Sequence, residues 1–318
     1  MKIVFMGTPE FAVTILDKII EVGHQVVGVV TTPDKPAGRG QHLHFSDVKQ
    51  YALAHELPIL QPEKMKDEQF IQELAAWDAD VFVVVAFRML PKVVYTIPPK
   101  GTFNVHASLL PQYRGAAPIQ WAIINGEQKS GVTTFFLDEH TDTGAIIRQT
   151  EVEIADTDTG GILHDKLMLA GAQIAIDTLS DIEHGTLNLK EQPQSENLKP
   201  APKIFKEDMH INWNDTAENI YNKIRGLSPY PTAFGLIGFN DGKQERNLFM
   251  KIYECHITDI KSKEKPGTIT IKDDKRLTIC TQNFEIAIEN LQLEGKKRMN
   301  TEDFLKGFRK DNYTDFLI

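Results

Sequence analysis

The sequence predicts an α/β domain with a doubly wound, mostly parallel sheet, followed by a small β-barrel domain. In the first part of the chain, short runs rich in Val and Ile alternate with segments of helical spacing, which is typical of such sheets. From Lys190 the chain becomes polar and proline-containing, and the segments beyond it are short, β-like and separated by turns. A length of 318 residues is also typical of two domains.

Periodicity and stop signals define the elements of the first domain. Apolar residues recur at helical spacing from Phe11 to Val22, and Gly23 supplies a stop. We predict helices over Pro9–Val22, Asp47–His55, Asp67–Ala76 and Gly161–Glu183. Runs of the buried parallel-strand type predict strands at Lys2–Met6, Gln25–Thr31, Pro58–Leu60, Val81–Phe87, Thr102–Ala107 and Gly131–Leu137.

The second domain begins with one helix and continues as short strands. Thr216 is a suitable cap for a helix that ends at Gly226. Strands are predicted at Ala233–Ile237, Leu248–Ile257, Gly267–Ile271, Leu277–Cys280 and Glu285–Leu291, and their short lengths favour a barrel. We therefore divide the chain into residues 1–189, a linker at 190–206, and residues 207–318.

Composition excludes several classes of protein. The two cysteines, Cys255 and Cys280, exclude a disulfide scaffold and any four-cysteine metal site. The chain contains no run of about 18 apolar residues, so no transmembrane helix is predicted. The N-terminus lacks the basic and apolar regions of a secretory signal, so we expect a soluble, cytoplasmic protein.

Charge is distributed unevenly along the chain. Residues 1–203 carry 17 Lys and Arg against 26 Asp and Glu, whereas residues 204–318 carry 18 of each. The neutral second part holds three basic clusters: Lys261, Lys263 and Lys265; Lys272, Lys275 and Arg276; Lys296, Lys297 and Arg298. Such clusters are compatible with a solvated face, but three of them together favour an anionic partner.

The segment at residues 101–123 is the strongest candidate for a site. Asn104 and His106 are two apart on a predicted strand, so both side chains point to one face of an otherwise apolar sheet. Asp142 follows the next strand, and we expect it in a turn at a similar edge. An Asn amide and a protonated His can both donate to an oxyanion, at about 3–4 kcal/mol for each good donor. A nearby Asp can orient the imidazole and favour its charged form.

The remaining motifs are weaker candidates for a functional site. The turn Gly7–Ala12 lacks the glycines of a dinucleotide or P-loop fingerprint, so a nucleotide cofactor is not predicted. His42 and His44 have no evident third ligand, so neither is a metal site. Residues 31–47 look like a long exposed loop, in which Lys35 and Arg39 are placed to meet a phosphate or a base.

Together these motifs resemble the folate-dependent formyltransferases. The match rests on FNVHASLLPQYRGAAPI at residues 103–119 with DTG at 142–144. The motifs GTPEFA, PDKPAGRG, INW with IRGLSPYPTAF, and GKKRMNTEDFLKG narrow it to members that act on initiator tRNA, and the resemblance covers nearly the whole chain.

The resemblance implies transfer of the formyl group of 10-formyltetrahydrofolate to the amine of methionyl initiator tRNA. It assigns the catalytic role to Asn104, His106 and Asp142, without a metal. It places Ser108, Leu109, Leu110 and Pro111 at the folate, and the loop with Arg39 and Lys35 at the tRNA. It further implies an OB-like C-terminal barrel that helps hold the tRNA, and we expect a monomer.

Two other functions remain open from the sequence. One is a related formyltransferase that acts on a small amine, such as a sugar nucleotide, and the other is a catalytically idle tRNA-binding protein. The sequence departs from the usual family pattern at Gln112, at residues 41–48, and at Arg88 and Met89 beside the expected folate pocket.

Overall fold

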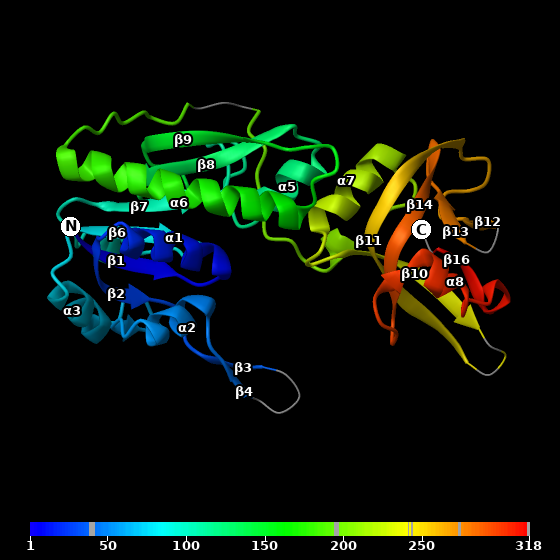
Figure 1. Ribbon diagram of the computed structural model, residues 1–318, viewed down its shortest axis with the longest axis horizontal. Coiled ribbons are helices and arrows are strands. Elements are labelled where there is room, and N and C mark those ends of the chain that lie inside the picture. Colours follow the sequence, from blue (N-terminus) through cyan, green and yellow to red (C-terminus); the bar gives the residue numbers. More distant parts are fainter. Residues whose placement is uncertain (38–41, 194–196, 241, 243, 273–274, 317–318) are drawn as a thin grey trace. The chain divides into compact units, whose positions relative to one another are not determined.

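The computed structural model describes residues 1–37, 42–193, 197–240, 242, 244–272 and 275–316. The chain forms two compact units (Figure 1). The first comprises residues 1–118, 129–153 and 164–202, and the second comprises residues 119–128, 154–163 and 203–318. Among the described residues, no helix is both long enough and apolar enough to cross a membrane.

The first unit is built on a sheet of seven described strands. Their order is β5 (Ile59–Leu60), β2 (Gln25–Val30), β1 (Lys2–Gly7), β6 (Val81–Val85), β7 (Thr102–His106), β8 (Lys129–Phe136) and β9 (Ile146–Glu153). From β5 to β7 all neighbours are parallel, whereas β8 is antiparallel to both β7 and β9. The mostly parallel sheet is therefore confirmed, and β9 is a strand that the sequence analysis did not predict.

Helices cover both faces of this sheet, as a doubly wound fold requires. The helices of this unit are α1 (Glu10–Glu21), α2 (Asp47–Ala54), α3 (Glu68–Ala76), α4 (Lys92–Tyr95) and most of α6 (Gly160–His184), whereas nearly all of α5 (Pro118–Ile124) belongs to the second unit. On one face Val4 and Phe82 pack with Phe70 and Leu74 of α3. On the other face α1 and α6 lie together (Figure 1), so closely that a Cβ at Gly171 would meet Ile15 at 3.3 Å.

The described residues between 31 and 47 include a hairpin rather than a plain loop. The short strands β3 (Lys35–Ala37) and β4 (His42–His44) pair in antiparallel register, with Lys35 opposite His44. Ser46 then caps α2 by accepting a hydrogen bond from the Lys49 N–H, which confirms the predicted helix start.

The second unit is a curled antiparallel sheet. Its path is β12 (Ile269–Lys272), β13 (Arg276–Cys280), β14 (Phe284–Leu293), β11 (Glu245–Lys261), β10 (Ala233–Asn240) and β16 (Tyr313–Phe316), with β15 (Met299–Asn300) beside β14. The Phe316 N–H donates to the Gly267 carbonyl at 3.0 Å, which joins the end of β16 to the residues just before β12. This bond between the two edges confirms the predicted barrel; β15 and β16 were not predicted.

One buried core organises the second unit and includes the predicted helix. Besides α5, the helices here are α7 (Ala217–Leu227) and α8 (Thr301–Leu305), with short 3₁₀ turns at Glu207–Met209 and Lys310–Asn312. Trp213 is fully buried and packs on Phe316, with ring centroids 5.0 Å apart. Arg225 is also buried, and it donates to the carbonyls of Ala155 and Asp158. These residues of the segment 211–234 therefore stabilise the fold.

Candidate active site

Asn104 and His106 lie at the end of β7. The carboxyl ends of the parallel strands β1, β6 and β7 meet at one edge of the sheet, which is where open α/β folds bind ligands. His106 is only 7% exposed, whereas Asn104 is half-buried. Within the described residues the Asn104 carboxamide has no hydrogen-bond partner, so its donors remain available to a substrate.

The imidazole of His106 is held at one nitrogen and left open at the other. Nε2 lies 2.9 Å from the Tyr113 carbonyl oxygen, which can only accept, so Nε2 carries a hydrogen. Nδ1 lies 4.0 Å from Oδ2 of Asp142. Nδ1 is therefore the nitrogen that remains open to a substrate, and it faces the Asp142 carboxylate.

Asp142 reaches this position from the opposite edge of the sheet. The sequence analysis expected Asp142 in a turn at a similar edge, and Asp142 does lie beside His106, but β8 runs antiparallel to β7, so the loop begins at the opposite end of β7. The Leu137 N–H, just after β8, donates to the carbonyl of Thr102 at the start of β7. The loop at residues 137–145 must therefore fold back along β7 to bring Asp142 to His106.

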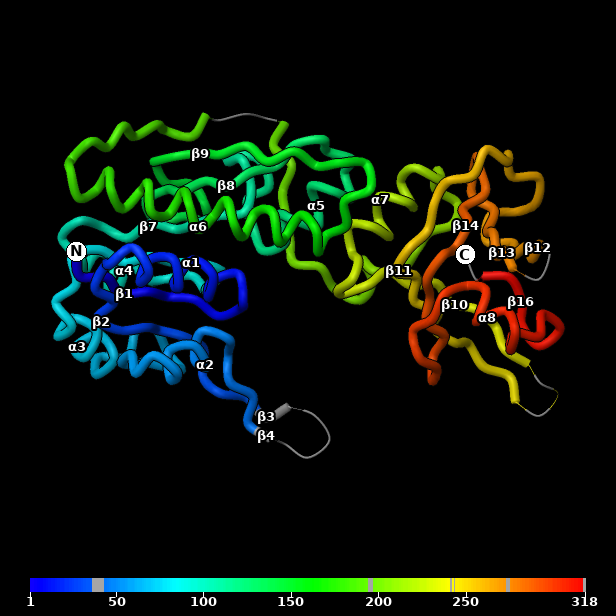
Figure 2. The backbone as a smooth tube through the Cα atoms, in the orientation of Figure 1, coloured from blue at the N-terminus to red at the C-terminus, as the bar shows by residue number. Residues whose placement is uncertain are grey.

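A backbone donor fixes the Asp142 carboxylate. The Gly115 N–H donates to Oδ2 of Asp142 at 2.9 Å. Gly115 has φ +126°, and a Cβ there would meet the Ala201 carbonyl oxygen at 2.4 Å, so only glycine fits this turn. The segment after α6 lies beside β9 at Lys190 (Figure 2), and farther along the chain Lys199 and Ala201 bond to Tyr113 and Arg114.

The four residues implied at the folate site form a tightly bonded loop. Ser108 and Leu110 are buried, whereas Leu109 and Pro111 are half-buried. The Leu110 N–H donates to the Thr133 hydroxyl at 3.1 Å, and its carbonyl accepts from Nε2 of Gln149 at 2.8 Å. Leu109 and Pro111 therefore present the accessible surface, while Ser108 and Leu110 hold the loop in shape.

Gln149→Ala is expected to raise KM for the folate donor that the resemblance implies by about threefold to tenfold, while kcat falls less than twofold. The variant leaves the buried Leu110 carbonyl without its donor, which costs about 1–3 kcal/mol and loosens the loop. Steady-state kinetics with varied donor measure the split. Arg148→Ala on the same strand, whose partner is Asp181, is the control; a lowered kcat with an unchanged KM for Gln149→Ala would contradict this role.

The remaining sequence candidates are placed differently. Lys35 is exposed on β3, whereas Arg39 lies outside the described residues. Met89 is 71% exposed. Arg88 donates to the carbonyls of Pro62 and Glu63, and burial lowers the pKa of its guanidinium. Arg88 therefore ties the segment after β6 to the loop before α3.

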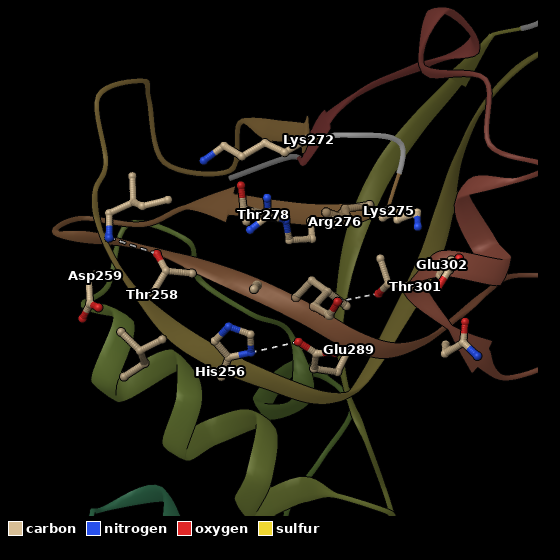
Figure 3. Close-up of a pocket in the computed structure, with 16 residues that line it drawn as sticks. His256, Thr258, Asp259, Lys272, Lys275, Arg276, Thr278, Glu289, Thr301 and Glu302 are labelled. Carbon is tan, nitrogen blue, oxygen red and sulfur yellow. Dashed lines mark hydrogen bonds and ion pairs between the residues drawn. The ribbon is translucent and has the colours of Figure 1, made fainter.

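The second unit contains a hollow of its own (Figure 3). It has a volume of about 590 Å³ and lies over β11, β13 and β14. Its charged lining is mixed, since His256 Nδ1 lies 2.9 Å from Glu289 Oε1 and Lys272 is paired with Glu285. The other charged residues around it are Asp259, Lys275, Arg276 and Glu302.

Some basic residues of the predicted clusters are paired with acidic residues, so only part of the positive charge of this unit is available to an anionic partner. Arg298 pairs with Glu254 and lies over the Tyr253 ring, and Lys272 is held by Glu285. Lys296 and Lys297 are both exposed in the turn after β14.

Comparison with known proteins assigns the family over nearly the whole chain. Residues 1–179 match the formyl transferase family, and residues 203–309 match the formyl transferase C-terminal domain. A methionyl-tRNA formyltransferase of Bacteroides fragilis is 50% identical over 313 residues, covering 97% of this chain and 95% of that protein. The chain belongs to the methionyl-tRNA formyltransferase family. The methionyl-tRNA formyltransferase of Flavobacterium johnsoniae is also 50% identical, over 96% of each chain.

Solved structures share the formyltransferase fold. The sugar 3N-formyltransferase WlaRD, crystallised in the presence of dTDP and 5-N-formyl-THF, aligns with a TM-score of 0.64 and 22% identity over 93% of this chain and 99% of its own. HypX from Aquifex aeolicus in complex with tetrahydrofolic acid aligns with a TM-score of 0.62 and 16% identity over 99% of this chain and 50% of its own. At these identities the similarity concerns the fold alone.

Proposed function

We propose that this formyltransferase moves the formyl group of 10-formyltetrahydrofolate to the amino group of methionyl initiator tRNA, for translation initiation in the cytoplasm. Residues 1–189 carry the reaction and residues 207–318 contact the tRNA, with 190–206 between them. The observation that carries the catalytic proposal is the arrangement of His106, whose Nδ1 faces Asp142 while Nε2 is fixed by Tyr113.

The reaction proceeds by direct attack of the neutral amine on the formyl carbon. The carbonyl oxygen becomes an oxyanion, which accepts hydrogen bonds from the Asn104 amide and from the protonated Nδ1 of His106. The bond from the formyl carbon to N10 of the folate then breaks, and the proton lost by the amine is passed to N10. Asp142 supports the charged imidazole throughout and helps relay that proton.

The acceptor of the formyl group distinguishes this proposal from the alternative of a formyltransferase that acts on a small amine. The second unit does not by itself distinguish the two acceptors, because the sugar 3N-formyltransferase WlaRD aligns over 93% of this chain. The names of the similar proteins favour methionyl-tRNA as the acceptor. The acceptor assay therefore compares methionyl initiator tRNA, free methionine and an amino-sugar nucleotide, each with 10-formyltetrahydrofolate. Fast turnover on the tRNA alone is expected, whereas turnover on the amino sugar alone would overturn the acceptor.

The double variant Lys296→Ala with Lys297→Ala is expected to weaken tRNA binding about threefold to thirtyfold. These two exposed lysines are placed to contact phosphates, and each lost phosphate contact lowers the salt slope of binding by about one. Filter binding at several salt concentrations measures the slope. The exposed Lys64 and Lys66 of the first unit, changed to alanine together, provide the control. An unchanged slope in the Lys296 and Lys297 variant would remove this surface from the interface.

We retain the expectation of a monomer. Sedimentation of the free enzyme tests it, and a stable dimer would overturn it.

A further inference from the structure

Gln192 makes four hydrogen bonds that join the two loops around His106. Its Nε2 donates to the carbonyls of Asp142 and Gly144, each at 2.9 Å. Its Oε1 accepts from Nε and Nη2 of Arg114, at 3.1 and 2.5 Å. A carboxamide has two donor hydrogens and two acceptor lone pairs, so all of its hydrogen-bonding capacity is used here.

The loop that carries Asp142 needs this support. Asp142 has φ +56°, a left-handed conformation that costs a non-glycine residue energy. Two residues later, a Cβ at Gly144 would meet the Phe136 carbonyl oxygen at 1.7 Å, so the chain turns tightly there. Gln192 bonds to the main chain at both residues and thereby fixes the turn on either side of Thr143.

The carboxamide oxygen of Gln192 supports the loop whose Gly115 N–H holds the Asp142 carboxylate. Arg114, which Gln192 accepts from, directly precedes Gly115, whose N–H donates to the Asp142 carboxylate. Gln192 is itself anchored, because Lys190 exchanges two backbone hydrogen bonds with Ile146 at 2.8 and 2.9 Å. One side chain thus sets both the backbone that carries Asp142 and the loop that holds its carboxylate.

We infer that Gln192 is a positioning residue for formyl transfer, which acts by holding the Asp142 carboxylate at its place beside Nδ1 of His106. Gln192 itself touches no reacting atom. This inference rests on the proposed function, since it assigns Gln192 its effect through Asp142. A displacement of about 1 Å at a catalytic group lowers rates by up to a hundredfold, which sets the scale of the expected effect.

The test is the rate of formyl transfer to methionyl initiator tRNA, with kcat and both KM values measured separately. Gln192→Ala is expected to lower kcat about tenfold and to leave both KM values within about twofold. Gln192→Glu still accepts from Arg114 but donates to neither carbonyl, so it is expected to lose as much. Glu191→Ala, an exposed neighbour on the same segment, is the matched control and is expected to keep the native kcat.

A double-mutant cycle with Asp142→Asn distinguishes positioning from a general loss of structure. Because Gln192 acts through Asp142, Gln192→Ala is expected to lower kcat less than twofold further in the Asp142→Asn background. A full tenfold loss in that background, or a native kcat for Gln192→Ala in the native background, would overturn the inference. A native kcat for Asp142→Asn alone would overturn the proposed catalytic mechanism, on which the role of Gln192 rests.

Discussion

His106→Ala is expected to lower kcat by at least a thousandfold or so, which is the largest effect of any single change in this chain. The variant removes the donor at Nδ1, and loss of one oxyanion donor costs about a hundredfold to a thousandfold. It also removes the charged partner of Asp142, the residue that helps relay the proton of the amine, a contribution of about a hundredfold or more. Single-turnover transfer to methionyl initiator tRNA measures the chemical step directly.

His106→Gln separates this chemistry from stability. Alanine removes the His106 donor to the buried Tyr113 carbonyl, at a cost of about 1–3 kcal/mol. The glutamine amide can still donate to that carbonyl but can neither gain nor lose a proton near neutral pH. We therefore expect the glutamine variant to unfold at nearly the native temperature and to be as inactive as the alanine variant. Turnover within tenfold of native in His106→Gln would remove His106 from the mechanism.

The chemistry-bearing residues could be predicted from the sequence, because they follow from local pattern. Asn104 and His106 are two apart on a strand, and that spacing alone puts both on one face. The capping residue Ser46 and the helix over 160–184 follow from equally local signals. The parallel order of β1, β6 and β7 follows from the alternation of strands and helices, and it places the end of β7 at the ligand-binding edge.

The path of Asp142 could not be predicted in the same way. Strand direction depends on the connection between strands, and Val132 and Phe135 would be buried in a parallel or an antiparallel β8 alike. β9 is hidden for a related reason, since most of its residues from Arg148 to Glu153 are exposed and polar. The contacts of Gln192 could not be predicted from the sequence either. The polar residues around it have no periodicity, and its partners at Asp142 and Arg114 are distant in the sequence.

Asp142→Asn is expected to lower kcat by about a hundredfold with little change in stability. Asparagine keeps an oxygen that can accept from the Gly115 N–H, so the loop geometry is retained. What is lost is the negative charge 4.0 Å from Nδ1 of His106. Two unit charges at about that distance interact by about 4 kcal/mol at an effective dielectric constant of 20, and partial exposure of the carboxylate reduces this.

A double variant of Asp142 and His106 tests most directly whether the carboxylate acts through the imidazole. If Asp142 acts by favouring the charged imidazole, the asparagine variant can cost almost nothing once His106 is already glutamine. We expect kcat of the double variant to lie within about threefold of His106→Gln alone. Asp181→Asn, which removes a carboxylate paired with Arg148 elsewhere on the same unit, controls for a general effect of charge. Independent, multiplying losses in the double variant would mean that the proton relay, and not support of the imidazole, is the main role of the carboxylate.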